Sequence, residues 1–202
     1  MLDQEARDLL DLMEAATKGG RPKLETLPHV VGRHAVDKMS ADGEAEPPEV
    51  AEVADGGFAG PASEILFRRY RPMGVAAGLL PTLIYYHGGG FVIGTIETHD
   101  STCRRLANKS RCQVISIDYR LSPEHPFPAP IDDGVAAFRH IRDNAELFGV
   151  DASRIAVGGD SAGGAIAAVV CQLCRDAGEV GPAFQMLIYP ATDSSKESAS
   201  RK

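Results

Sequence analysis

The 202-residue sequence has little positive charge, no long apolar run and few cysteines, and each shortage narrows what the protein can be. Lysine and arginine number 21 against 28 aspartates and glutamates, which gives a formal net charge of −7. Such an acidic chain has no basic surface to neutralise phosphates, so we expect no nucleic-acid partner. Because 44% of the residues are apolar, the chain is long enough for one substantial core.

The sequence shows no targeting or membrane segment. Its N-terminus is acidic and mixed, without the positive region and apolar stretch of a secretory signal. The apolar run from Ala165 to Cys171 is far shorter than the roughly 20 residues that a membrane span needs. We therefore expect a cytoplasmic protein without a membrane span.

The four cysteines do not form a recognisable metal set. Cys171 and Cys174 have the spacing of half a zinc site or of a redox pair, but no second cysteine pair or later histidine completes it. The segment that holds them is rich in alanine and valine, so we expect both thiols to fill the core. No metal and no organic cofactor is predicted.

The periodicity of apolar residues changes along the chain. Helical spacing predicts an amphipathic helix over residues 1–18 and a weaker one over 28–39, and the acidic, proline-bearing residues 41–48 indicate a linker. From about residue 50 strands alternate with helices. The expected strands are 63–70, 83–86, 114–117, 155–157 and 184–189, and the expected helices are 98–109, 131–142 and 162–174. This alternation predicts an α/β fold whose mainly parallel sheet has helices on both faces and ligands beyond the carboxyl ends of its strands.

The segment Gly159-Asp160-Ser161-Ala162-Gly163 follows an expected strand and opens an expected helix. In that context the G-x-S-x-G pattern is typical of a nucleophile elbow, a sharp turn whose small flanking residues let a strained serine project from the sheet. The helix N-terminus behind Ser161 favours developing negative charge. Taken alone, the motif also fits a glycine-rich turn whose serine caps the helix.

A second motif, His-Gly-Gly-Gly at residues 87–90, follows another expected strand and is much rarer by chance. Acyl transfer needs backbone N–H donors aimed at the oxyanion of the tetrahedral intermediate, and glycines let the main chain approach a substrate closely. We expect Gly88 and Gly89 to supply two donors of this oxyanion hole and Ala162, the residue after the nucleophile, to supply the third. Together the two motifs predict that Ser161 is a catalytic nucleophile.

Three segments together resemble the bacterial branch of the hormone-sensitive lipase family: Tyr86 to Asp100, Asp118 to Ala129 and Gly158 to Gly164. The likeness covers most of residues 63–193. It implies an α/β-hydrolase fold and hydrolysis of carboxylic esters, usually with short or medium acyl chains. It also implies a helical cap over the active site, built partly by the N-terminal helices.

This resemblance divides the chain into three parts. Residues 1–45 fit the N-terminal cap segment, residues 46–193 a partial α/β-hydrolase core, and residues 194–202 a truncated tail. The family pattern is not followed at Ala165, where the family places asparagine; this affects the hydrogen bonding of the elbow and not the nucleophile.

The resemblance also bears on histidines near the motifs. It implies that His87 braces the glycine loop and is not the catalytic base. Glu124 and His125 have the residue types of an acid–base pair. They are adjacent in a proline-rich loop whose prolines stiffen the chain, so we expect them to have a structural role.

The sequence lacks a complete catalytic triad. In this fold the triad follows the order Ser, then Asp or Glu, then His, yet all six histidines precede Ser161. Asp193 is the only later acid expected near the strand ends, and it has no histidine to orient. We therefore expect a C-terminally incomplete chain with little or no turnover by itself, in which the strand at 184–189 is an exposed apolar edge.

Three functions are open on these residues. The first is a serine carboxylesterase or lipase-like hydrolase acting on a small-molecule ester, of which the chain carries the nucleophile and the oxyanion hole. The second is a non-catalytic binding module that holds an ester or a carboxylate in the same pocket. The third is an inactive fragment that pairs with another chain through the exposed sheet edge, and all three are compatible with an oligomer.

Overall fold

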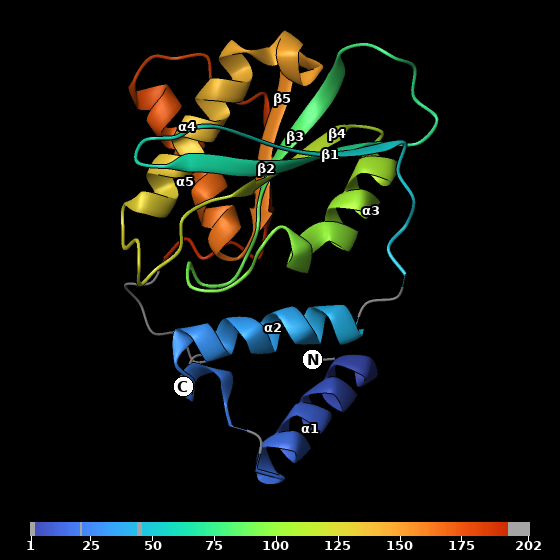
Figure 1. Ribbon diagram of the computed structural model, residues 1–202, viewed down its shortest axis with the longest axis vertical. Coiled ribbons are helices and arrows are strands. Elements are labelled where there is room, and N and C mark those ends of the chain that lie inside the picture. The colour runs from blue at the N-terminus through green and yellow to red at the C-terminus, as the bar shows by residue number, and fades with distance from the viewer. Residues whose placement is uncertain (1–2, 21, 44–45, 194–202) are drawn as a thin grey trace.

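The computed structural model describes residues 3–20, 22–43 and 46–193, and a six-stranded sheet with helices on both faces forms its centre (Figure 1). The strands are β1 (Glu52–Ala59), β2 (Glu64–Arg71), β3 (Leu80–Tyr86), β4 (Gln113–Asp118), β5 (Val150–Asp160) and β6 (Phe184–Ile188). They lie in the order β1-β2-β4-β3-β5-β6. The strands from β3 onward pair in parallel, whereas β1 and β2 pair antiparallel with each other and β2 pairs antiparallel with β4.

Helices cover both faces of this sheet. The helices are α1 (Gln4–Lys18), α2 (His29–Gly43), α3 (Asp100–Ser110), α4 (Ala129–Asp143) and α5 (Ala162–Asp176), with short 3-10 helices η1 (Leu24–Thr26), η2 (Glu97–His99) and η3 (Ala145–Phe148). Figure 1 shows α4 and α5 against one face and α3 against the other, while α1 and α2 form a separate layer beyond one end of the sheet. The predicted α/β fold class, with a mainly parallel sheet, is confirmed.

The alternation of side chains along β3 explains why both faces need cover. Ile84 and Tyr86 are buried in the cluster that α4 and α5 complete, whereas Leu83 and Tyr85 are buried in the cluster on the α3 side. Successive side chains of a strand point to opposite faces, so a central strand with a run of apolar residues at consecutive positions requires helices on both faces. This packing fixes the carboxyl end of β3, from which the glycine motif continues.

The sequence predictions erred mainly at the first strand and at element ends. β1 was not predicted because Gly56 and Gly57 interrupt its β-forming pattern. In the structure Gly56 is paired with Phe67, and a Cβ at Gly56 would lie 2.6 Å from the Phe67 ring, so the glycine makes room for an aromatic side chain. The second helix runs on to Gly43, into the expected linker, and β5 is longer than predicted at both ends.

The last strand, β6, pairs only with β5 among the described residues and lies at one edge of the sheet. Phe184 at its start is 67% exposed, so the predicted apolar edge is confirmed in this part of the chain. The predicted tail, residues 194–202, lies outside the described residues. In the described part of the chain, no helix combines the length and apolar character needed to cross a membrane.

Candidate active site

Ser161 lies in the turn between β5 and α5, at the carboxyl end of the parallel strands. Its φ of 51° and ψ of −112° are unusual for a residue with a side chain, and such strain is what an elbow that projects a serine requires. Hydrogen bonds hold the turn: the Ser161 N–H donates to the Ile188 carbonyl at 2.9 Å, and the Ala191 N–H donates to the Ser161 carbonyl at 3.0 Å. The serine is therefore set by backbone contacts on both sides.

Two glycines of the elbow are required by close packing against β3. A Cβ on Gly159 or on Gly163 would overlap the Tyr86 carbonyl oxygen, and one on Gly163 would also lie 2.7 Å from the His87 carbonyl oxygen. Contacts this short do not occur with real Cβ atoms, so only glycine allows the start of α5 to approach the end of β3. This approach brings the glycine motif at residues 87–90 next to Ser161.

The chain after β3 forms a tight turn in which three consecutive residues have left-handed backbone conformations. The φ angles are 122° at Gly89, 61° at Gly90 and 64° at Phe91. The N–H groups of Val92 and Ile93 both donate to the Gly89 carbonyl at 3.0 Å and close the turn. The glycines are thus needed for the conformation as well as for access to a ligand.

One predicted oxyanion donor, the N–H of Gly88, makes a hydrogen bond within the chain. Its N–H donates to Asp160 Oδ1 at 2.9 Å, and the residue is buried, so this donor is already occupied. Within residues 3–20, 22–43 and 46–193, no hydrogen bond uses the N–H of Gly89, Gly90 or Ala162. The N–H groups of Gly89 and Ala162, predicted as oxyanion donors, are thus without a partner in this part of the chain, as is that of Gly90, which the sequence reasoning did not include.

Asp160, the residue before the nucleophile, is the centre of a hydrogen-bond network that the sequence analysis missed. Its Oδ1 accepts from the Tyr85 hydroxyl at 2.7 Å and from Gly88 N–H, and it lies 3.3 Å from His99 Nε2. Burial raises the pKa of Asp160, but the hydrogen bonds from His99 and Tyr85 outweigh it and hold the pKa below its usual value. The ionised carboxylate therefore links the elbow to the glycine motif.

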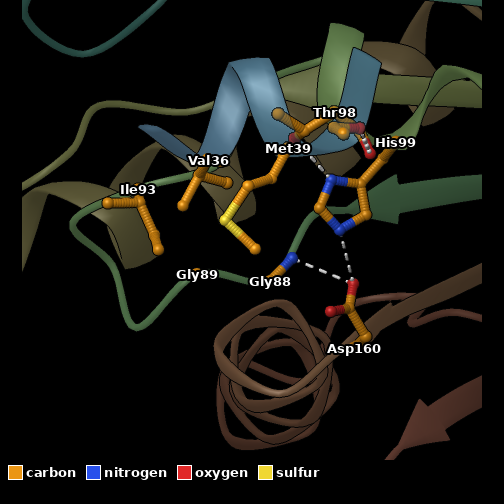
Figure 2. Close-up of a pocket in the computed structure, with 10 residues that line it drawn as sticks. Val36, Met39, Gly88, Gly89, Ile93, Thr98, His99 and Asp160 are labelled. Carbon is orange, nitrogen blue, oxygen red and sulfur yellow. Dashed lines mark hydrogen bonds and ion pairs between the residues drawn. The ribbon is translucent and has the colours of Figure 1, made fainter. Parts of the chain in front are cut away.

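A cavity of about 300 Å³ opens above this network (Figure 2). Its lining residues are Val36, Met39, Ser40, Gly88, Gly89, Ile93, Gly94, Thr98, His99 and Asp160. Figure 2 shows the side chains of Val36 and Met39, from α2, on the side of the cavity opposite Asp160. One wall is thus apolar and the other polar, as in a site for a small molecule with both kinds of group.

His87 is fully buried and lies beside the loop it was predicted to brace. Its Nδ1 is 2.8 Å from the Gly88 carbonyl, its ring stacks on Tyr119 with centroids 4.3 Å apart, and the Tyr119 hydroxyl donates to the His87 carbonyl at 2.6 Å. Burial disfavours the charged ring and lowers the pKa of His87 to about 4. These contacts support a bracing role for a neutral imidazole.

No histidine in the described part of the chain hydrogen-bonds to the Ser161 hydroxyl. His99 is the histidine that pairs with a carboxylate inside the cavity, and its partner is Asp160. The signal that could have found this pair is that Asp160 ends one central strand, β5, and that His99 lies in the segment that follows another, β3. Glu124 and His125, expected to be structural, are exposed in the proline-rich loop, where Glu124 pairs with Arg33 and His29.

The cysteines give no indication of a metal or redox site. Cys174 is buried, Cys171 is half-buried, and burial raises the pKa of both thiols. Among the described residues no group of three or more histidine, cysteine, aspartate or glutamate side chains could hold a metal ion.

Residues 83–202 match the family described as alpha/beta hydrolase fold, which is more than half of the chain. The chain belongs to this family. Among curated members it is 47% identical over 169 residues to the carboxylic ester hydrolase LipN of Mycobacterium tuberculosis, an alignment that covers 80% of this chain and 44% of LipN. It is 51% identical over 130 residues to the carboxylesterase NlhH of the same organism, covering 64% of this chain and 40% of NlhH. These matches confirm the resemblance to hormone-sensitive lipase-type esterases.

Solved alpha/beta hydrolases show the same fold over the whole chain. An alpha/beta hydrolase enzyme from the metagenome of Lake Arreo, crystallised as a Ser161Ala mutant, is 86% identical with a TM-score of 0.96; the match covers 100% of this chain and 63% of that one. An esterase from Pyrobaculum calidifontis is 40% identical with a TM-score of 0.90, covering 99% of this chain and 63% of the esterase. The chain spans under half the length of the curated relatives and under two thirds of these solved ones.

Proposed function

We propose that this chain carries the nucleophile and the oxyanion hole of a carboxylic ester hydrolase that acts by serine acyl transfer. The observation that carries the proposal is the strained backbone of Ser161, φ 51°, at the start of α5, beside a glycine turn whose exposed N–H groups have no partner among the described residues. A serine hydroxyl on such a turn, next to N–H donors without a partner, suits the attack on a carbonyl and the stabilisation of the oxyanion that results.

In the proposed reaction Ser161 Oγ bonds to the ester carbonyl carbon, and the carbonyl oxygen becomes an oxyanion that accepts hydrogen bonds from the N–H groups of Gly89, Gly90 and Ala162. The alcohol then leaves with a proton, and water hydrolyses the acyl-serine in a second step of the same kind. Asp160 holds Gly88, and His87 supports the loop from the interior; neither bonds to the reacting carbonyl group. The residues of the chain thus bind and orient, and no cofactor is assigned.

The proton of Ser161 has no histidine acceptor in this sequence after residue 161, where the fold places its base. We therefore expect slow acylation by this chain alone, at the residual roughly 10³–10⁴-fold over the uncatalysed reaction that an oxyanion hole and binding sustain. Slow acylation would distinguish this chain from an enzyme with a complete catalytic triad.

The substrate class that we propose is a small ester with a short or medium acyl chain. The cavity of about 300 Å³ is lined by Val36, Met39 and Gly89 but not by Ser161, so it lies beside the glycine turn and does not by itself define the acyl group. The relatives support the class: besides the carboxylesterase NlhH, an ethyl acetate hydrolase of Pseudomonas putida is 42% identical over 130 residues, covering 63% of this chain and 41% of that protein. The cytoplasmic location and the N-terminal cap over residues 1–45 stay predictions.

The experiment compares the chain with Ser161→Ala on a short-chain chromogenic ester. We expect slow release of the chromophore and an acylated serine detected by intact mass in the unchanged chain, and neither in Ser161→Ala. The control is Ser153→Ala, because Ser153 is exposed and, in the part of the chain that the structure describes, its hydroxyl bonds only to Asp151 of the same strand. Equal rates and no acyl-serine in the chain and in Ser161→Ala would contradict the proposal, and saturable binding of the ester without cleavage would favour the binding module.

A further inference from the structure

Arg33 connects α2 to two loops that are far from it in the sequence. Its guanidinium donates from Nε to the Val92 carbonyl at 2.7 Å and from Nη2 to the Ser122 carbonyl at 2.9 Å. It also makes a two-pronged ion pair with Glu124, Nη1 to Oε1 at 2.8 Å and Nη2 to Oε2 at 2.7 Å. One side chain therefore joins the N-terminal helix layer, the glycine turn and the proline-rich loop.

The bond to Val92 is made to the turn that carries the unpartnered N–H groups. Val92 N–H and Ile93 N–H both donate to Gly89, so the Val92 peptide is part of the ring that sets the direction of the Gly89 and Gly90 N–H groups. Three consecutive left-handed residues with a non-glycine, Phe91, among them form a strained arrangement that persists only when its surroundings hold it.

The proline-rich loop gives the turn a second support, and Arg33 binds that loop too. Ser122 N–H donates to the Phe91 carbonyl at 2.8 Å, and the Ser122 carbonyl accepts from Arg33. The guanidinium thus closes a connected circuit of hydrogen bonds around Phe91 and Val92. A planar guanidinium with fixed donors can do this, whereas an ammonium group, a compact point charge, cannot reproduce the same set of directions.

An ion pair adds to the carbonyl contacts of Arg33. Glu124 faces it from the proline-rich loop, and His29, one turn earlier on α2, lies 3.1 Å from the same carboxylate. The hydrogen bond to Glu124 raises the pKa of Arg33, and the bond from Arg33 holds the pKa of Glu124 at about 2. The pair is exposed on the Glu124 side, so the carbonyl bonds, on the half-buried side of Arg33, carry the positioning.

We propose that Arg33 is a positioning residue for the oxyanion hole: by holding the Val92 and Ser122 carbonyls from α2, it sets the direction of the Gly89 and Gly90 N–H groups. The docking of the N-terminal helices is thereby coupled to the reactivity of Ser161. The catalytic meaning of this inference rests on the proposed function, but the restraint on the turn does not.

The test uses hydrogen exchange at the amides of Val92 and Ile93 in the full chain, with Arg33→Met, Arg33→Lys and Glu124→Gln. We expect exchange at these two amides about tenfold faster in both Arg33 variants, because loss of the carbonyl bonds loosens the turn by about the worth of one hydrogen bond. Glu124→Gln keeps both carbonyl bonds and should stay near the unchanged chain. Arg154→Met is the control, because among the described residues the Arg154 side chain pairs only with Asp151, at the amino-terminal part of β5.

A second readout separates positioning from a general structural role. In the Ser161-dependent acylation by the chromogenic ester, the rate constant should fall severalfold in Arg33→Lys, whereas the KM for the ester should change little. Unchanged exchange at Val92 and Ile93 in Arg33→Lys would overturn the inference, as would exchange that rises equally throughout the sheet. Arg33→Lys keeps the positive charge and a similar side-chain length, so the test can still be made if Arg33→Met does not fold.

The two proposals fail in different ways. Faster exchange at Val92 and Ile93 without any Ser161-dependent acylation in the unchanged chain would contradict the proposed function and leave the restraint on the turn intact. The opposite result is that the unchanged chain is acylated at Ser161 but Arg33→Lys changes neither the acylation rate nor the amide exchange at Val92 and Ile93. That result would contradict the positioning role alone.

Discussion

The N-terminal helices and the sheet are held in place by different kinds of contact. In the sheet and its covering helices the large apolar side chains are buried, with Ile84, Tyr86 and Phe138 no more than 1% exposed. In α1 the apolar side chains of Leu10, Leu12 and Met13 are more than half exposed. Two residues of the face that sequence periodicity would bury, Leu10 and Met13, are therefore largely open to solvent.

Polar contacts hold α2 in place, whereas apolar burial holds the sheet and its helices. Arg33 binds two loop carbonyls and Glu124, and the Ser40 hydroxyl donates to the Thr98 carbonyl at 3.2 Å. Such contacts specify an orientation but contribute modestly to stability, because each replaces hydrogen bonds to water. The comparison teaches that the sheet is held by apolar burial, whereas the orientation of the helix layer above the cavity is held by a few directional hydrogen bonds.

The largest expected effect is a cavity in the core. Phe138 of α4 is 1% exposed and packs in the larger cluster, so Phe138→Ala should lower the free energy of unfolding by about 3–5 kcal/mol. Urea unfolding followed by circular dichroism measures this change. A loss below about 1 kcal/mol would break the comparison, because it would mean that the sheet is no better packed than the helix layer.

Acid should lower the free energy of unfolding by a comparable amount, because His87, the first residue of the glycine motif, is buried in its neutral form. The pKa of His87 is about 4 because burial disfavours the imidazolium, whereas an unfolded chain has an ordinary pKa near 6.5. Between these values the unfolded state binds a proton that the native state does not. The stabilisation is therefore complete above pH 6.5 and is lost as the pH falls toward 4, by about 3 kcal/mol.

Urea unfolding at pH 7 and pH 4, for the chain and for His87→Gln, isolates this contribution. The variant should lose about 3 kcal/mol less between the two pH values, since it has no imidazole at this position. His125→Gln, which removes an exposed imidazole, is the control. An identical pH dependence in the chain and in His87→Gln would show that the buried ring accepts its proton without unfolding.

The smallest effect is expected on the exposed face of α1. Leu12 is 69% exposed, so Leu12→Ala should change the free energy of unfolding by less than about 0.5 kcal/mol. Parallel urea curves measure it. A loss of 2 kcal/mol or more would show that this face is covered in solution, and the contrast between the two regions would then vanish.

Local patterns in the sequence predicted the secondary-structure elements and the turn at Ser161, because neighbouring residues determine them. The strands and helices from residue 63 onward, and the elbow at Ser161, follow from apolar periodicity and from glycines at a strand-to-helix turn. The first strand was missed because Gly56 serves a contact with Phe67 that no local pattern shows. Its role depends on the neighbouring strand.

The details of the candidate site depend on contacts across the chain. The side chain of Asp160 accepts a hydrogen bond from the N–H of Gly88, and nothing in the glycine motif predicts this contact. The pairing of His99 with Asp160 and the reach of Arg33 to Val92 likewise join residues about 60 positions apart. Such contacts appear only when the sheet order brings the strand ends together.

The position of β3 at the centre of the sheet has a consequence for the newly made chain. Both strands that flank it, β4 and β5, follow it in the sequence, so its pairing is incomplete until the ribosome has passed residue 160. Non-local pairing of this kind is slow, because a long loop must close before the contacts form. During that interval β3 has open apolar edges, and aggregation competes with folding until the turn at Ser161 is made.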